Sequence, residues 1–537
     1  MNNNNNNRTS FIDSILASPG FQPGAVRPVV FSEDEQKVKD LIIKYCAYYN
    51  AEHADLQEPL VARITGGWVR DKLLGRESHD LDIAINLTSG LEFAEGLNKF
   101  IASHASELGI EPKNIHKIEK NPEKSKHLET ATTRLYGLDI DFVNLRSEVY
   151  AENSRIPIAA FGTPEEDAFR RDATLNALFY NLQAEEVEDL THQGLTDLEA
   201  GILRTPLLPF ETFNEDPLRV LRLIRFSSTF GFTIAPECLQ AMRDPRIESA
   251  FMIKISRERV GVEIFKALSS DRPQLCLALV EATGLYNAVF HLLEAYHPAG
   301  VNDFTPPASN LEIALRAAND TITRGPAALV EKVVHNRASP TALHFWLAVA
   351  LNPWEGVVAQ DEKKKPVAAV NKIVREGLKL STQDATTVAK ALALHAEDLG
   401  PLGAGPARIA DLDRLALGLL VRKAGEHWDL FFLYSLFKDL VSAYTSNNNN
   451  NHAAATTDAI FEKYNLLVQK IQDLDLDDAW ALKPIINGKE LSKLYGSKGG
   501  QWMTRALQSL VEEQLRNPAL TKDQAMEFML ERKSLFL

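Results

Sequence analysis

The sequence has little cysteine, no long hydrophobic run and no excess of positive charge. It has only three cysteines in 537 residues, and Cys46, Cys238 and Cys276 lie too far apart in the chain for a disulfide framework or a zinc knuckle. The densest apolar run, Phe345–Leu351, is far shorter than the ~18 residues that a membrane-spanning helix needs. The formal net charge of −14 argues against a protein that coats nucleic acid with its whole surface, but it is compatible with a local basic groove.

The N-terminus lacks the pattern of a secretory signal, because no long apolar core follows a basic segment. With Arg8 and the early acid Asp13, it is a poor match to a mitochondrial presequence. We therefore expect a cytoplasmic protein, and leave the nucleus and the mitochondrion open as further compartments. The asparagine runs Asn2–Asn7 and Asn447–Asn451 are low-complexity segments, which predict a disordered tail and a surface loop.

The remaining composition is that of an ordinary globular protein, with 45% apolar and 24% charged residues, and the length predicts three or four domains. From about Asp34 to Pro206, short β-type runs are mixed with helical patterns. From Asn214 onward the pattern is helical nearly to the end, and Asn214 itself is a candidate helix N-cap. The sequence thus predicts a mixed α/β head followed by a long helical region.

A glycine pair marks the first candidate site, in the stretch GGWVRDKLLGRESHDLDIAI (Gly66–Ile85). Gly66 and Gly67 at a strand-to-helix turn would let the backbone approach a bulky anion, toward which the first N–H groups of the helix would point. Arg70, one turn into the helix, could add a charge-assisted contact to phosphate. A glycine pair alone is usually only a turn, so the interpretation depends on the residues that come after it in the chain.

Paired carboxylates occur ten residues later. Asp80 and Asp82 flank Leu81 on a predicted strand, so their side chains point the same way. Such a pair suits a hard cation such as Mg²⁺, which can support phosphoryl transfer. Asp139 and Asp141 form a second same-face pair, either of which could supply a third carboxylate, although an ordinary exposed strand face explains them equally well.

The segment FRRDATLNALFYNL (Phe169–Leu182) is predicted to be helical. Arg170 and Arg171 would then point about 100° apart, so both cannot face one ligand squarely. Asp172 and Asn176 would share a face at spacing i, i+4 and could hydrogen-bond a ribose. A solvated helical face is the alternative for this segment taken alone.

Together these stretches resemble the class II tRNA nucleotidyltransferases, the CCA-adding enzymes. The glycine–carboxylate stretch resembles the family's first motif, and FRRDATLNALF resembles the second. LDIDFVNLRSEVY and the second motif look most like eukaryotic members. The resemblance is strong over about residues 60–270. The later matches, in the family's order, are EDLTHQGLTDLEAGILRTP (Glu188–Pro206), NEDPLRVLRLIRF (Asn214–Phe226), ISRERVGVEIFKAL (Ile255–Leu268) and a C-terminal element, INGKELSKLYGSKGGQWMTRAL (Ile486–Leu507).

The resemblance implies an α+β fold, with a polymerase-β-like nucleotidyltransferase head followed by an all-helical neck, body and tail. The expected divisions are a disordered N-terminal tail (1–33), the head (34–206), the neck (207–270), the body (271–445), a low-complexity loop (446–456) and the tail (457–537). Within GSKGGQW (Gly496–Trp502) of the tail, a phosphate contact and a plain helix–helix turn are equal alternatives.

The family's site residues carry over to matching positions of this sequence. The resemblance implies that Asp80 and Asp82 bind Mg²⁺. Asp141, from the second same-face pair, is the candidate third catalytic carboxylate. The resemblance also implies nucleotide-binding residues, namely Gly66, Gly67, Arg70, Arg171, Asp172, Asn176, Asp216, Arg219, Arg222 and Arg225.

The fourth motif suggests how such a protein could select C and A. Asp216, Arg219 and Arg222 fall at i, i+3 steps and would share one helical face, which Arg225 continues. A carboxylate accepts a hydrogen bond from the exocyclic amine of cytosine or adenine, whereas uracil and guanine present a carbonyl there. That mismatch costs roughly 1–3 kcal/mol. A salt-bridge ladder on a solvated helix, with Glu215 and Arg219 as one pair, is the alternative.

The expected function is template-independent, Mg²⁺-dependent addition of CCA to the tRNA 3′ end from CTP and ATP, with release of pyrophosphate. Two alternatives remain open. One is a poly(A) polymerase, or an enzyme that adds only CC or only A, of the same superfamily. The other is a non-catalytic RNA-binding protein on this fold, against which the paired carboxylates argue.

Overall fold

The computed structural model describes residues 10–18, 20–21, 26–78, 81–118, 130–149, 158–298, 305–336, 338–393, 406–446 and 453–537. Asp80 and both asparagine runs lie outside these residues, so the predictions for them stay predictions. The chain forms two compact units, Met1–His291 with Gly377–Lys379, and Leu292–Glu376 with Leu380–Leu537.

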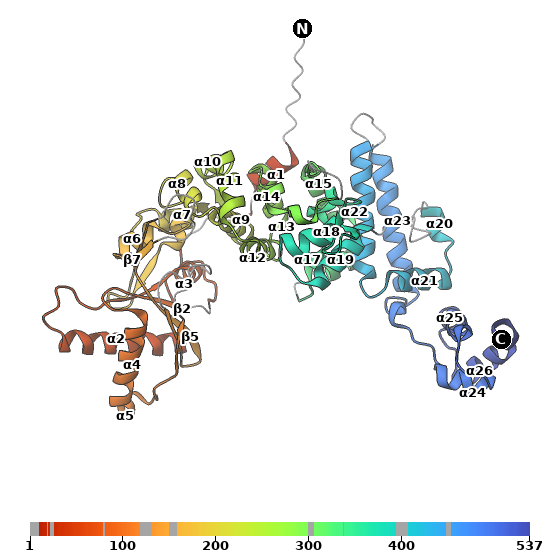
Figure 1. The fold of residues 1–537 in the computed structure, drawn as a ribbon, viewed down its shortest axis with the longest axis horizontal. Helices are drawn as coiled ribbons and strands as arrows, with labels where there is room; N and C mark the ends of the chain where they lie inside the picture. Colours follow the sequence, from red (N-terminus) through yellow and green to blue (C-terminus); the bar gives the residue numbers. More distant parts are fainter. Residues whose placement is uncertain are drawn as a thin grey trace, which may run out of the picture. The chain divides into compact units, whose positions relative to one another are not determined.

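A seven-stranded sheet forms the head of the first unit, in the order β3-β4-β5-β2-β1-β8-β9 (Figure 1). Its described strand pairs are antiparallel except β2–β5, which is parallel. The predicted strands at 61–65, 81–85 and 138–145 correspond to β1, β2 and β5. The strands are β1 (Ala62–Thr65), β2 (Leu81–Ile85), β3 (Ile115–Ile118), β4 (Thr130–Leu135), β5 (Leu138–Asn144), β8 (Phe179–Asn181) and β9 (Glu186–Glu188).

Two helices, α2 (Glu33–Glu52) and α4 (Gly90–Ser103), cover one face of this sheet. The ring of Tyr45 on α2 lies 5.1 Å from that of Phe93 on α4, which in turn lies 5.0 Å from Phe142 on β5. Along β5 the buried residues alternate with partly exposed ones, as expected for a sheet with one covered face. The carboxylates of β5 therefore lie on the face away from α4.

Helix α3 (Gly67–Leu73), which follows β1, is fixed to α2 by a buried carboxylate. Glu35 accepts hydrogen bonds from Nε1 of Trp68 at 2.9 Å and from Nζ of Lys72 at 2.6 Å. Glu35 is only 5% exposed. Burial alone would raise the pKa of Glu35, but Lys72, Ser32 and Trp68 lower it below its ordinary value of 4.5.

We expect Glu35→Ala to lower the free energy of unfolding by about 2–4 kcal/mol, because Lys72 and the Trp68 N–H lose their buried partner. The folded-state pKa of Glu35 is lowered, so its contribution is present above pH ~4.5 and disappears as the pH falls through the folded-state value. Urea unfolding of both proteins at pH 7 and at successively lower pH measures this. Glu33→Ala is the matched control, because Glu33 begins the same helix with its side chain 86% exposed. An equal loss in both variants would contradict the role of Glu35.

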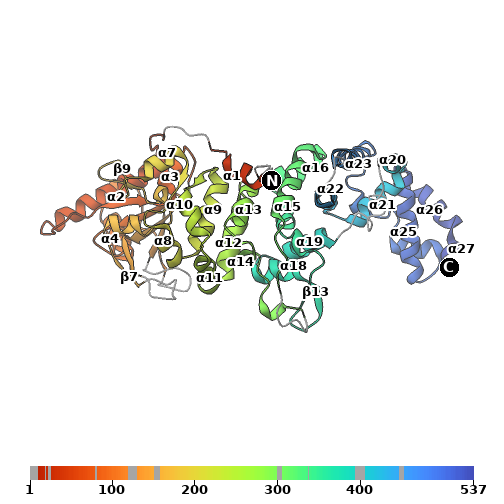
Figure 2. The ribbon, with the colours of Figure 1, turned by 90° about the horizontal axis from the view of Figure 1, so that it is seen from above.

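Further helices and short strands complete the first unit. Both views place α9, α12 and α13 side by side, and these helices are in contact (Figures 1 and 2). Small strand pairs, β6–β7 and β10–β11, accompany them. The elements are α5 (Ala105–Leu108), β6 (Arg146–Val149), β7 (Ile158–Phe161), α6 (Pro164–Phe169), η2 (Thr174–Asn176), α7 (Gly194–Ala200), β10 (Ile202–Leu203), α8 (Pro209–Glu215), α9 (Leu218–Phe230), β11 (Thr233–Ile234), α10 (Pro236–Met242), α11 (Pro245–Lys254), α12 (Arg257–Leu268), α13 (Pro273–Ala282) and α14 (Tyr286–Val289).

A short helix, α1 (Phe11–Ala17), lies in the segment that the sequence predicts as a disordered tail. Ser10 caps it by accepting hydrogen bonds from the backbone N–H groups of Ile12 and Asp13. Ile12 is buried, and α1 packs against α13. This part of the segment is therefore ordered by contact with α13.

Among its described residues, the second unit contains helices and one hairpin, β12–β13. The turn of this hairpin is closed by the Asp361 carboxylate, which accepts two backbone N–H groups. Within the described ranges, no helix is both long and apolar enough to cross a membrane. The elements are η3 (Glu294–Tyr296), α15 (Leu311–Arg324), α16 (Ala327–Val330), η4 (Glu331–His335), α17 (Thr341–Ala350), η5 (Asn352–Trp354), β12 (Val358–Gln360), β13 (Pro366–Ala368), α18 (Ala369–Lys372), η6 (Ile373–Gly377), α19 (Thr382–Ala393), α20 (Pro406–Ala410), α21 (Arg414–Ala424), α22 (Trp428–Ser446), α23 (Ala453–Asp473), η8 (Ala479–Ala481), α24 (Gly488–Tyr495), α25 (Gln501–Arg516), α26 (Lys522–Glu531) and α27 (Lys533–Phe536).

Candidate active site

The glycine turn between β1 and α3 lies between the guanidinium of Arg171 and the carboxylate of Asp82. Gly66 has φ +76°, a conformation that favours glycine. A Cβ added there would lie 3.5 Å from Nη1 of Arg171 and 3.9 Å from Oδ2 of Asp82. Gly67 begins α3, and a Cβ on it would lie 3.2 Å from Nη2 of Arg70. The predicted strand–glycine–helix arrangement is present, with charged groups of both signs beside it.

Two partly exposed carboxylates lie next to each other on the face of the sheet opposite to α4. Asp82 on β2 is in register with Asp141 on the parallel strand β5, and residues in register point to the same face. Oδ1 of Asp141 also accepts a hydrogen bond from Oγ1 of Thr132 at 2.5 Å. Asp139 is 74% exposed and lies 3.7 Å from Arg134. Of the two candidates for a third carboxylate, Asp141 is therefore the one beside Asp82.

The donors at this position suit Mg²⁺, which binds carboxylate oxygens through one or two side chains and keeps several waters. Among the described residues, no three acidic, histidine or cysteine side chains cluster closely enough to form a complete metal site. The predicted ligand Asp80 lies just outside those residues. Asp82 and Asp141 fit the expected chemistry, and the metal assignment stays a prediction.

Arg171 is held directly above the glycine turn. Its Nη2 donates to Oγ1 of Thr65 at 2.5 Å, and its Nη1 donates to the backbone oxygen of Asn176 at 3.1 Å. Its Nε and Nη2 both reach Oδ2 of Asp167, while Arg170 binds the other oxygen. Burial acts to raise the pKa of Asp167, but the two guanidinium groups outweigh this effect and lower the pKa to about 2. The neighbouring arginines therefore share one carboxylate, and Arg171 alone also reaches the turn.

The second motif is not the continuous helix that the sequence predicts. Helix α6 ends at Phe169, a short 3-10 turn covers 174–176, and strand β8 begins at Phe179. Phe179–Asn181 join the sheet as β8, beside β1, and this tertiary contact outweighs the helical spacing. Asp172 and Asn176 nevertheless meet, because Nδ2 of Asn176 donates to Oδ1 of Asp172 at 2.9 Å.

A buried polar network joins α3 to α9 through this turn. Nη1 of Arg70 donates to Oδ1 of Asn176 at 2.5 Å, and Nε of Arg222 donates to Oδ2 of Asp172 at 2.5 Å. Burial opposes the charge of Asp172, but Arg222 and Asn176 lower the pKa of its carboxyl. The same pairing raises the pKa of Arg222, and burial lowers that of Arg70. These hydrogen bonds hold Arg70 and Arg222 in fixed positions.

The fourth motif differs from the predicted single helical face. Asp216 is not helical, with φ −127° and ψ +93°, and α9 begins only at Leu218. Pro217 is the reason, since the residue before a proline is disfavoured in the helical region. The expected N-cap, Asn214, is therefore wrong, because this residue lies within α8. Oδ1 of Asp216 instead accepts a hydrogen bond from the backbone N–H of Leu218 at 3.2 Å.

The arginines of α9 are each held by a neighbouring element. Nη2 of Arg219 donates to the backbone oxygen of Arg170 at 2.6 Å, and its Nη1 lies 3.8 Å from Glu215. The expected Glu215–Arg219 pair is therefore present, but Arg219 itself is buried. Nε of Arg225 donates to Oε2 of Glu263 at 2.6 Å. A salt-bridge ladder on a solvated helix therefore does not explain Arg219, because Arg219 is buried.

Sequence reasoning missed two residues of the fifth motif, Arg259 and Glu263 on α12. Nη2 of Arg259 donates to Oδ2 of Asp216 at 3.0 Å, and Oε1 of Glu263 lies 3.9 Å from Nη1 of Arg222. Their i, i+4 spacing places them on one helical face, which was a usable signal. Their partners, about 40 residues away in the chain, were not evident from the pattern.

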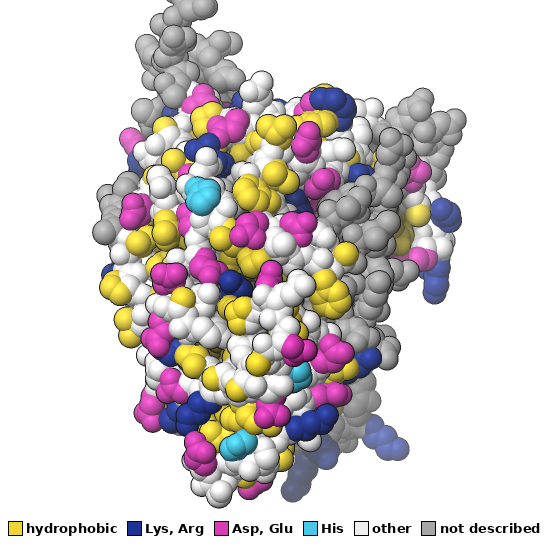
Figure 3. All heavy atoms as spheres, turned by 90° about the vertical axis from the view of Figure 1, so that its left-hand side faces the viewer, with side chains coloured by type: hydrophobic (Ala, Val, Ile, Leu, Met, Phe, Trp, Pro, Cys, Tyr) yellow, Lys and Arg dark blue, Asp and Glu magenta, His cyan; other side chains and the backbone are white. Residues whose placement is uncertain are grey.

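Charged side chains of both signs are interspersed on the face of the molecule drawn in Figure 3. This agrees with the acidic net charge.

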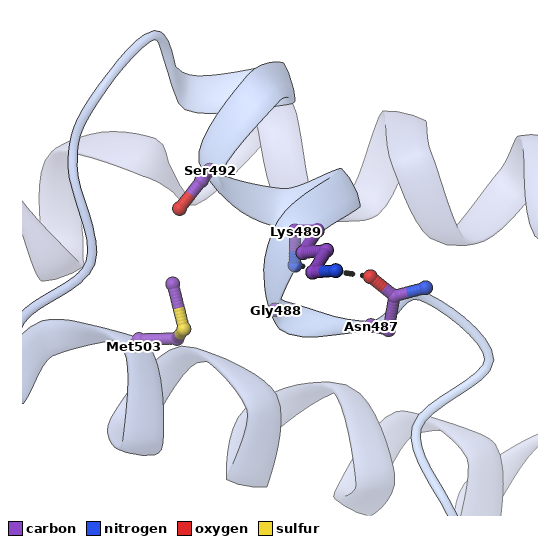
Figure 4. Close-up of a pocket in the computed structure, with 5 residues that line it drawn as sticks. All are labelled: Asn487, Gly488, Lys489, Ser492 and Met503. Carbon is purple, nitrogen blue, oxygen red and sulfur yellow. Dashed lines mark hydrogen bonds between the residues drawn. The ribbon is translucent and has the colours of Figure 1, made fainter.

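The glycine-rich turn of the C-terminal element joins α24 and α25. The ring of Trp502 stacks on Tyr495 at 5.3 Å, and its Nε1 donates to the backbone oxygen of Lys498. A shallow pocket of about 780 Å³ lies beside these helices (Figure 4). The predicted phosphate contact stays a prediction. The pocket is lined by Asn487, Gly488, Lys489, Ser492 and Met503.

Comparison with known proteins places the chain in a family. Residues 62–204 match the Poly A polymerase head domain, and residues 231–296 match the probable RNA and SrmB-binding site of polymerase A. The chain is 42% identical over 519 residues to the mitochondrial CCA tRNA nucleotidyltransferase of Saccharomyces cerevisiae, covering 92% of both proteins. It is 40% identical to the mitochondrial CCA tRNA nucleotidyltransferase of Candida glabrata, covering 93% of this chain and 96% of that protein.

The fold agrees with this relationship. A solved structure of a CCA-adding enzyme with CTP superposes with a TM-score of 0.60 at 20% identity, covering 96% of this chain and all of that chain. These findings confirm the predicted α+β fold, with a polymerase-type head and a helical C-terminal region. The chain belongs to the family of CCA tRNA nucleotidyltransferases.

Proposed function

We propose that this chain builds the 3′-terminal CCA of tRNA from CTP and ATP, without a nucleic acid template, and releases pyrophosphate. The observation that carries the proposal is the likeness to CCA tRNA nucleotidyltransferases over more than nine-tenths of the chain. Two features of the structure support the proposal. Asp82 lies in register with Asp141, and the Gly66 turn lies next to both Asp82 and Arg171.

Asp80 and Asp82 are the proposed Mg²⁺ ligands, with Asp141 as a third carboxylate. Bound Mg²⁺ would lower the pKa of the primer 3′-hydroxyl and neutralise charge that develops on the phosphates. The register of Asp82 with Asp141 supports the assignment, because it brings the oxygen donors of two carboxylates together on one face of the sheet. Thr132 fixes one oxygen of Asp141, so that carboxylate is already oriented.

The glycine turn and Arg171 are the proposed binding site for the triphosphate. The backbone at Gly66 and Gly67 can approach an anion closely, and Arg171 can add a charge-assisted hydrogen bond to it. Arg70 donates to Asn176, which in turn donates to Asp172. We therefore assign Arg70 to holding this pair near the ribose, in addition to its predicted contact with the nucleotide.

Asp216 and the arginines of α9 are the proposed base-selecting groups. The Asp216 carboxylate would accept from the exocyclic amine of cytosine or adenine, and an arginine would donate to the adjacent ring acceptor. The side chain of Arg222 is 37% exposed and that of Asp216 is 16% exposed. Arg219 and Arg225 would hold the pocket and the phosphates.

The test is incubation of the purified protein with tRNA that lacks CCA, Mg²⁺ and each labelled nucleotide in turn. The proposal predicts incorporation of C, C and then A, with no G or U. Addition of a long A tail to any RNA would identify a poly(A) polymerase, and a product that stops after CC or starts only from CC would identify a partial enzyme. A folded sample that binds tRNA and incorporates nothing would leave only a binding protein.

We further propose that the enzyme acts in the cytoplasm and also serves the nucleus and the mitochondrion. Two relatives carry the word mitochondrial in their names, which supports the mitochondrial part. Imaging of the full chain, fused at its C-terminus to a fluorescent protein, tests this. Signal in the cytoplasm, the nucleus and the mitochondria is the expected result, and absence of mitochondrial signal would contradict the mitochondrial part.

A further inference from the structure

Helix α12 presents a charge pattern opposite to that of the α8–α9 segment. Arg259 contacts Asp216 through both terminal nitrogens, at 3.0 Å and 3.5 Å. One helical turn later, Glu263 contacts Arg225 at 2.6 Å and Arg222 at 3.9 Å. The guanidinium of Arg259 thus faces the carboxylate of Asp216. The carboxylate of Glu263 faces two arginines of the fourth motif, Arg222 and Arg225.

Asp216 needs an external support, because its backbone is not helical. It lies between the end of α8 and the start of α9, and one carboxylate oxygen accepts the N–H of Leu218. Arg259 approaches both oxygens. The guanidinium thereby fixes the rotation of the carboxylate, while the backbone N–H fixes only one of its oxygens.

We infer that Arg259 is a positioning residue for base selection, which aims the carboxylate of Asp216 at the incoming base. The inference depends on the proposed role of Asp216. Discrimination by a hydrogen bond requires an acceptor in a fixed place, because a carboxylate that can turn away no longer penalises the carbonyl of uracil or guanine. On the same face of α12, Glu263 accepts a hydrogen bond from Arg225 at 2.6 Å and lies 3.9 Å from Arg222.

The guanidinium is essential to this role. Its planar fork can contact both oxygens of a carboxylate, whereas a lysine ammonium is a single point charge. A lysine in place of Arg259 would retain the charge and lose the orientation. The two substitutions Arg259→Ala and Arg259→Lys therefore separate charge from orientation.

The experiment measures kcat/KM for CTP and for UTP on tRNA that lacks CCA, in Arg259→Ala, Arg259→Lys, Asp216→Ala and the Arg259→Ala/Asp216→Ala double variant. We expect Arg259→Ala to reduce the preference for CTP over UTP by about 10- to 100-fold, and Arg259→Lys to restore only part of it. The double variant should discriminate no worse than Asp216→Ala. Arg246→Ala is the matched control, because Arg246 pairs with Asp244 on α11 with its side chain 70% exposed.

The outcomes separate the inference from the proposed function. Unchanged preference in Arg259→Ala and Arg259→Lys, with Asp216→Ala impaired, would overturn the positioning role alone. Multiplying losses in the double variant would also overturn it, since the two residues would then act independently. Unchanged preference in Asp216→Ala would instead refute the proposed role of Asp216. Thermal melting of each variant shows whether Arg259→Ala folds, and Arg259→Lys keeps the test open if it does not.

Discussion

Asp82→Ala is expected to reduce transfer from both CTP and ATP by at least about 10³-fold, while binding of tRNA persists. The substitution removes a carboxylate from the face of the sheet opposite to α4, where it lies in register with Asp141. Loss of a proposed metal ligand would affect the chemical step for every nucleotide equally. Single-turnover transfer and a gel-shift assay with the same tRNA measure the two properties.

Asp139→Ala is the control for this prediction, because Asp139 belongs to the same sheet with a 74% exposed side chain. It should retain nearly full transfer. Asp80→Ala should behave like Asp82→Ala. If Asp82→Ala retained transfer at the rate of the unmodified enzyme, the metal assignment would be refuted.

Asp216→Ala is expected to lower the preference for C and A over U and G by about 10²-fold or more, with a smaller effect on tRNA affinity. A site that hydrogen-bonds a polar group rejects a ligand that lacks it by up to about 10⁴-fold. Removing the acceptor removes that penalty and leaves Arg259 without the partner it has at 3.0 Å. Competition between labelled CTP and UTP on tRNA lacking CCA measures the preference directly.

Asp244→Asn serves as the control for Asp216→Ala. Asp244 is the N-cap of α11, and asparagine keeps the cap while removing the charge. This variant should select nucleotides as the unmodified enzyme does. An unchanged preference in Asp216→Ala would count against base selection by the fourth motif.

The sequence predicted the strands around the site because their patterns are local. A β-branched run before Gly66 and an alternating run through Asp82 are enough to place β1 and β2. The glycine turn and the following helix were found for the same reason. These elements hold the first motif, and they form as the sequence predicts.

Tertiary contacts decided the features that the sequence could not predict. Asp141 lies beside Asp82 because β5 pairs in parallel with β2, and no local pattern distinguishes Asp141 from Asp139. The prediction that Asp172 and Asn176 lie on one helix was wrong. The two side chains are nevertheless hydrogen-bonded to each other across a turn. Pro217 was a visible signal that Asp216 precedes α9, and applying it would have corrected the single-face prediction.

Anomalous diffraction from crystals grown with Mn²⁺ and a non-reactive CTP analogue locates the metal, the phosphates and the base in one experiment. We expect a manganese peak coordinated by Asp80 and Asp82, phosphates at the Gly66 turn, and the cytosine amine within hydrogen-bond distance of Asp216. A metal bound away from these carboxylates, or a cytosine whose edge faces away from α9, would contradict this expectation.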